Sequence, residues 1–180
     1  MRTSRFLLAT ILVASWAAAD THAADRKKLE ADVVAAIKAF QKADSGLRAT
    51  FEKAAGYAVF PNVGKGGFVL GGAHGNGLVY EQGKLIGTAS LTQVTVGAQV
   101  GGQEFAEVIF FEDAATLERF KESKLEMSAQ LSAVAAAEGA SRNAKYEQGV
   151  LVFTQAKKGL MAEASVGGQK FKFRPLDAED

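Results

Sequence analysis

The chain has 180 residues, of which 48% are hydrophobic and 23% are charged, and its formal net charge is +1. This length and composition predict one globular domain with a buried core, and the near-neutral charge gives no support to nucleic-acid binding. Because the sequence has no cysteine, it excludes disulfides, zinc sites built on thiolates, thiol nucleophiles and the acyl anchor of a bacterial lipoprotein.

Residues 1–23 have the pattern of a secretory signal peptide. Arg2 and Arg5 precede an apolar run at 6–19, and small residues follow it, so cleavage is expected after Ala19 or Ala23. Cleavage after Ala23 would also remove Asp20 and leave equal numbers of basic and acidic residues. We therefore expect a processed protein that is periplasmic or secreted and has no lipid anchor.

Residues 25–44 have the periodicity of an amphipathic helix that starts at Asp25. Apolar residues recur on one face, and basic residues flank them. The apolar members are Leu29, Val33, Ile37 and Phe40, and the basic members are Arg26, Lys27, Lys28, Lys38 and Lys42. This pattern has two interpretations: a helix that packs on the core with a solvated basic face, or a helix that lies on an anionic membrane surface.

A second helix is expected at 47–55, with Gly56 as a left-handed cap. Most of the chain's 19 glycines then fall between 56 and 102, among short runs of β-forming residues. The spacing matches neither a dinucleotide loop nor a Walker A loop. Strands are expected at 57–60, 67–71, 78–81, 85–100 and 105–111, with a bulge or a bend near 91–93 where the apolar face changes side. Glycine at this density favours a strongly bent sheet over a phosphate cradle.

The second half of the chain begins with a helix expected at 113–122, capped by Asp113. Residues 125–133 alternate in polarity as a strand does, although their alanine content leaves a helix open. After a loop at 138–147, strands are expected at 150–155, 160–166 and 169–173, joined by hairpin turns. Residues 175–180 form an acidic tail. A second basic patch consists of Lys157, Lys158, Lys170, Lys172 and Arg174.

The residues for catalysis or metal binding are sparse. After residue 23 the only histidine is His74, inside a glycine-rich stretch, and no serine lies in a nucleophile elbow. We interpret His74 as a turn residue rather than a catalytic base. The sequence therefore predicts no enzyme, no cofactor and no metal site.

Several motifs occur in an order that resembles the SYLF domain family. They are GYAVFP at 56–61, GKGG at 64–67, GGAHG at 71–75, VGAQVGGQ at 96–103 and GLMAEAS at 159–165. The resemblance covers residues 31–173 and implies one β-rich, lipid-binding domain. Relatives in eukaryotes are associated with phosphoinositides and actin, and a basic amphipathic N-terminal segment is linked to membrane contact. A periplasmic protein has no access to actin or to phosphoinositide signalling. From the resemblance we therefore expect binding of anionic phospholipid, and we do not expect the actin role.

These observations predict an α+β fold in a single compact domain at 24–174. Its core is a strongly bent, mostly antiparallel, glycine-rich sheet or partial barrel, with an N-terminal amphipathic helix and one or two further helices. The predicted function is non-enzymatic binding of anionic, phosphoinositide-like headgroups at a membrane surface of the cell envelope. The residues expected to contact lipid are the basic helix residues, Val33, Ile37, Phe40 and the second basic patch. The alternative is an envelope scaffold that binds another protein.

Overall fold

The computed structural model describes residues 9–66, 70–96, 103–128, 131–158 and 164–176. The helices are α1 (Ala9–Ala43), α2 (Leu47–Lys53) and α3 (Ala114–Lys121), with a short 3-10 turn at Ala140–Arg142. The strands are β1 (Gly56–Gly66), β2 (Leu70–Glu81), β3 (Lys84–Val96), β4 (Gln103–Phe111), β5 (Ser132–Ala135), β6 (Val150–Lys158), β7 (Ala164–Ser165) and β8 (Gln169–Pro175).

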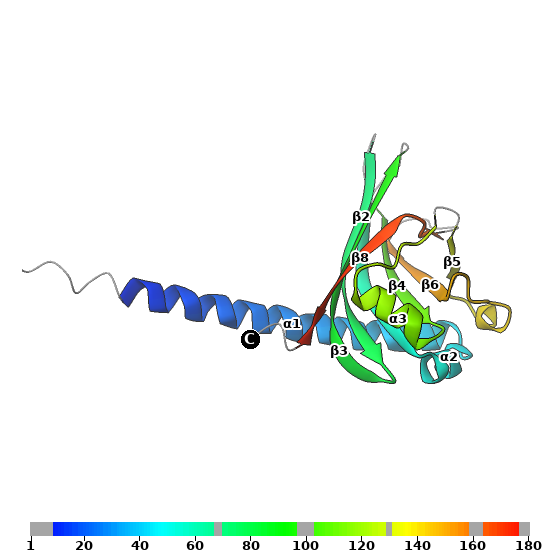
Figure 1. Cartoon of the computed structure of the whole chain (residues 1–180), viewed down its shortest axis with the longest axis horizontal. Coiled ribbons are helices and arrows are strands. Elements are labelled where there is room, and N and C mark those ends of the chain that lie inside the picture. The colour runs from blue at the N-terminus through cyan, green and yellow to red at the C-terminus, as the bar shows by residue number, and fades with distance from the viewer. Residues whose placement is uncertain (1–8, 67–69, 97–102, 129–130, 159–163, 177–180) are drawn as a thin grey trace, which may run out of the picture.

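The described strands form a sheet in the order β7-β5-β6-β4-β1-β2-β3-β8. All neighbours run antiparallel except β5 and β6, which are parallel. The sheet is open, because β7 and β8 stand at opposite ends of this order. Figure 1 shows the sheet curving around α3 on one side, with α1 along the other. The α+β fold with a strongly bent sheet is confirmed.

The curvature depends on small residues along the face of β2 that points toward α3. A Cβ atom added to Gly77 would collide with the Val59 carbonyl oxygen and with the ring of Phe60 on β1. Without that atom, Phe60 can lie over β2 and the strands can curl. The sheet bends so far that Gln169 on β8 donates a hydrogen bond of 2.9 Å to Glu107 on β4, although three strands separate them in the sheet.

Each face of the sheet carries its own hydrophobic core. On the inner face, Leu117 and Phe120 of α3 pack against Ile109, Phe111 and Phe171. On the outer face, Val33 and Phe40 of α1 and Leu47 of α2 pack against the strands. The outer-face strand partners include Tyr57, Val59, Leu78, Val108, Phe110 and Phe153. The sheet is therefore sandwiched between helices at its centre.

The helix boundaries differ from two predictions. Helix α1 begins at Ala9, so Asp25 lies inside it and caps nothing, because the residues before Asp25 contain no helix breaker. Gly56 begins β1 instead of ending α2 in a left-handed turn. Glycine is needed there for space, since an added Cβ would lie 2.6 Å from the Tyr80 carbonyl oxygen. In contrast, Asp113 caps α3 as predicted, because its Oδ1 accepts a hydrogen bond of 2.7 Å from the backbone N–H of Thr116.

The strand predictions fail where they assumed a break or a hairpin. The strands expected at 67–71 and 78–81 are parts of one strand, β2, so His74 lies in a strand and not in a turn. The described parts of β6, β7 and β8 do not form successive hairpins, since β7 pairs with β5 and β8 pairs with β3. The stretch at 125–133 makes one isolated bridge at Glu126 and then enters β5. Residues 67–69, 97–100 and 160–163 of the predicted strands lie outside the described residues.

Of the bulge or bend predicted near 91–93, the bulge is wrong. The pairing of β3 with β2 is continuous there, and its irregularity lies opposite Val79 and Tyr80. The prediction assumed that every inward residue is apolar, but Gln93 is buried on the inner face. Its Nε2 donates a hydrogen bond of 2.7 Å to the Gly167 carbonyl oxygen. Gln93, Glu107 and Gln169 thus form a buried polar group in the curve of the sheet.

Candidate functional site

The face of α1 toward the sheet is committed to the core. Val33 and Phe40 are fully buried, and Leu29 and Ile37 are partly buried against the same cluster. These residues recur with helical spacing, so they form one stripe. Contact of Val33 or Phe40 with lipid would require α1 to leave the sheet. The structure therefore shows this stripe packed on the core, as in the first of the two interpretations of the helix.

The opposite side of α1, which we call the outward face, is basic and carries no carboxylate. Its residues follow one another at helical spacing, and the acidic residues Asp25 and Asp32 fall outside that spacing. Glu30 lies at the edge of this face, within one turn of Lys27 and Val34, and its carboxylate pairs with Arg26. The outward face consists of Lys27, Ala31, Val34, Lys38 and Lys42, all of them exposed. Val34 has 47% of its surface exposed, which is unusual for a large hydrophobic residue. None of the three lysines forms an ion pair with a described residue.

The other basic residues of α1 are held by neighbouring carboxylates. Arg26 Nε lies 3.2 Å from Glu30 Oε1, and Lys28 Nζ lies 2.8 Å from Asp32 Oδ2. The hydrogen bond from Lys28 lowers the pKa of Asp32, and the same bond raises the pKa of Lys28. These ion pairs reduce the charge that Arg26 and Lys28 present to a membrane.

The second predicted basic patch is divided by the fold. Lys157 Nζ donates a hydrogen bond of 2.6 Å to Asn62 Oδ1, and the Asn62 amide donates one of 3.4 Å to Asp32. Lys157 is therefore connected to α1 through Asn62. The side chain of Lys158 lies outside the described residues.

The remaining members of that patch form the β8 basic strip, which consists of Lys170, Lys172 and Arg174. All are exposed, and they pair in register with Thr92, Ser90 and Thr88 of β3. His74 lies one strand further along the sheet, exposed and opposite Thr92. The structure thus brings the strip together but places it on the last strand, away from Lys157 in the strand order.

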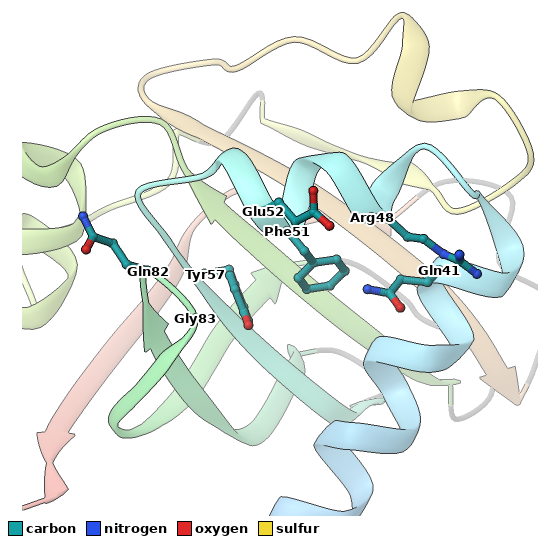
Figure 2. Close-up of a pocket in the computed structure, with 7 residues that line it drawn as sticks. All are labelled: Gln41, Arg48, Phe51, Glu52, Tyr57, Gln82 and Gly83. Carbon is teal, nitrogen blue, oxygen red and sulfur yellow. The ribbon is translucent and has the colours of Figure 1, made fainter.

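A groove that the sequence did not suggest lies between α1, α2 and the β2–β3 turn. Its volume is about 590 Å³. Figure 2 shows the residues that line it: Gln41, Arg48, Phe51, Glu52, Tyr57, Gln82 and Gly83. They come from α1, α2, β1 and the β2–β3 turn, so no local sequence pattern predicts the groove.

The described part of the chain contains neither a metal-binding cluster nor a membrane-spanning helix. No group of three or more histidine, cysteine, aspartate or glutamate residues could hold a metal ion. Among the same residues, no helix combines the length and the hydrophobicity needed to cross a bilayer.

Comparison with known proteins agrees with the family that the sequence motifs indicate. The family described as "Las17-binding protein actin regulator" (Ysc84) matches residues 92–178, which begin in the second half of β3. The chain belongs to the SYLF (Ysc84) family. This family is associated with lipid binding or actin regulation and is not known for enzymatic activity.

One curated relative of this SYLF protein is Beta cell expansion factor A from Aeromonas veronii. The two are 30% identical over 144 residues, which cover 76% of this chain and 52% of the relative. The chain therefore spans about half the length of that relative.

Proposed function

We propose that this SYLF-family protein binds phospholipid membrane surfaces that carry anionic headgroups, with the outward face of α1 as the main contact. The observation that carries the proposal is the separation of the two faces of this helix. Val33 and Phe40 hold α1 on the sheet, while Lys27, Lys38 and Lys42 are exposed on the other side. The carboxylate at the edge of that side, Glu30, is paired with Arg26. A lysine near an anionic membrane surface contributes about 1 kcal/mol.

The β8 basic strip is a second contact in this proposal. Its exposed cations suit the same headgroups, and their neighbours on β3 are hydroxyl residues that can donate hydrogen bonds to phosphate oxygens. The association of the family with lipid binding supports the proposal. The proposal does not include actin regulation, because the expected signal peptide would direct the processed protein to the cell envelope. We propose that it functions there.

The test is co-sedimentation of the purified protein with neutral and with anionic vesicles, at low and at high salt. We expect binding to anionic vesicles at low salt and its loss at high salt, because salt screens charges on exposed side chains. Replacing Lys27, Lys38 and Lys42 together by glutamate should weaken binding by roughly tenfold or more. A control that replaces Lys53, Arg142 and Lys145 by glutamate makes the same change in net charge at other exposed positions.

Three results would contradict this proposal. Equal binding by the two triple variants would remove the outward face of α1 from the contact. Binding that persists at high salt on neutral vesicles would show an apolar contact instead of a basic one. Failure to bind any vesicle would favour the alternative of an envelope protein partner.

A further inference from the structure

The groove in Figure 2 has an aromatic floor that is fixed from several sides. The rings of Phe51 and Tyr57 meet edge to face with centroids 4.9 Å apart, and Phe51 also meets Phe110 at 4.8 Å. Tyr57 stacks on Tyr80 at 4.9 Å. Burial raises the pKa of the Tyr57 hydroxyl, so this group stays neutral and able to donate a hydrogen bond. A rigid floor of this kind loses little freedom when a ligand binds.

The rim of the groove carries one charge of each sign. Arg48 and Glu52 lie one turn apart on α2, where opposite charges are close enough to pair. Both side chains are exposed, and they form no ion pair with each other or with another described residue. In Figure 2 the Arg48 guanidinium lies on the same side of the Phe51 ring as the Gln41 amide, and Tyr57 and Gln82 lie on the other side. The two charges are thus available to a third group.

We propose that this groove binds a zwitterionic phosphodiester of the phosphocholine or phosphoethanolamine class. The phosphate accepts hydrogen bonds from Arg48 and from the Gln41 amide. The ammonium group lies near the Glu52 carboxylate and beside the partly buried ring of Phe51, where cation–π attraction adds to the charge. An inorganic anion could use only Arg48 and the amides, and a simple amine could use only Glu52 and the Phe51 ring.

This site is separate from the outward face of α1 and does not depend on anionic lipid. Arg48, Glu52 and the aromatic floor belong to α2 and β1. Gln41 is the one groove residue on α1, near the end of that helix, whereas the outward face extends along α1 as far as Lys27. A membrane that contains both headgroup types would engage both surfaces. A free phosphodiester could also occupy the groove alone.

The experiment is an NMR titration of the purified, isotope-labelled protein with glycerophosphocholine. Glycerol 3-phosphate and choline serve as the two half-ligands. We expect saturable shifts of the amide signals of residues 48–57 and 82–83, and an apparent Kd at least about fivefold lower than for either half. Arg48→Gln and Glu52→Gln should each raise that Kd by about tenfold or more. The matched controls Arg142→Gln and Glu147→Gln, also at exposed positions, should leave the Kd unchanged.

Absence of shifts in the groove, or equal affinity for the whole ligand and its halves, would overturn the proposal. Thermal melting of each variant shows whether it is folded. The control pair measures how much a change in net charge alone alters the Kd. Vesicles of phosphatidylcholine decide the source of the ligand: competition with glycerophosphocholine identifies a lipid headgroup, and no competition identifies a free phosphodiester. Replacing Lys27 alone by glutamate, about four turns of α1 away from Gln41, should leave the groove affinity unchanged, which separates this result from the vesicle-binding test.

Discussion

The two faces of α1 differ in burial and in charge. The face toward the sheet contains Val33 and Phe40, both fully buried, and the opposite face contains Val34, with 47% of its surface exposed, between lysines. Of two adjacent residues in this helix, Val33 is therefore part of the core and Val34 is exposed to solvent. We infer that substitutions on the inward face change the free energy of unfolding, whereas those on the outward face change binding and leave stability nearly constant.

The largest expected effect comes from the inward face. Phe40→Ala removes a fully buried aromatic side chain that packs between α1 and the sheet, and should reduce the free energy of unfolding by about 3–5 kcal/mol. Val34→Ala on the outward face should change it by less than about 0.5 kcal/mol. Urea unfolding of both variants measures the contrast. A cost below about 1 kcal/mol for Phe40→Ala would mean that α1 is free to leave the sheet and insert its apolar stripe.

Two glycines of the sheet provide a similar contrast, because one lies against neighbouring atoms and the other has free space where a side chain would be. Gly77→Ala places a methyl group against the Val59 carbonyl and the Phe60 ring, whereas Gly64→Ala meets nothing within 4 Å. We expect Gly77→Ala to cost about 1–3 kcal/mol through overpacking, and Gly64→Ala to be nearly neutral. Thermal unfolding compares the pair. If both variants unfold at the same temperature, the curvature of the sheet does not depend on the missing side chain.

The anchor at the end of α1 gives an effect that depends on pH. Asp44 is buried, and its carboxylate accepts hydrogen bonds from the backbone N–H groups of Ser141 at 2.6 Å and Gly46 at 3.0 Å. Burial alone would raise the pKa of Asp44, but these hydrogen bonds outweigh it and the net pKa is below the usual 3.8. The carboxylate therefore stabilises the fold above its unfolded pKa, and this contribution is lost as the pH falls through the lower folded pKa.

Asp44→Asn should cost about 1–3 kcal/mol near neutral pH, because a neutral amide accepts these hydrogen bonds less well. The difference from the unsubstituted protein should shrink as the pH drops below 3.8. Urea unfolding at a series of pH values measures it. A difference that stays constant into acid would show that the charge of Asp44 is not the cause. Loss of this anchor would also loosen the register of α1 on the sheet.

Local patterns predicted those parts of the fold that depend on neighbours in sequence. Helical periodicity identified the buried stripe of α1, and the cap of α3 followed from Asp113. Alternation and glycine content indicated a bent sheet. These signals are strong because each residue's role is set within one or two turns of helix or one strand.

Contacts between residues far apart in the sequence could not be predicted from local patterns. The pairing of β8 with β3 joins residues some 80 positions apart, for example Leu91 and Phe171, so nearby turns suggested hairpins that do not form. The inward position of Gln93 was missed because its partner, Gly167, comes from a distant turn. The groove around Arg48 and Tyr57 was missed for the same reason, since its walls meet only in the folded chain.

The smallest expected effect concerns Val34 on the outward face. If this face lies on a membrane, the exposed part of Val34 becomes buried in it and contributes on the order of 0.5–1 kcal/mol. Val34→Ser should then weaken binding to anionic vesicles by about two- to fivefold, at an unchanged melting temperature. The salt dependence should stay the same, because the substitution leaves Lys27, Lys38 and Lys42 in place. Vesicle titrations at two salt concentrations measure both quantities. Equal affinity of the two proteins would mean that the lysines hold the helix above the headgroups without burying its apolar side chains, so that charge alone supports the contact.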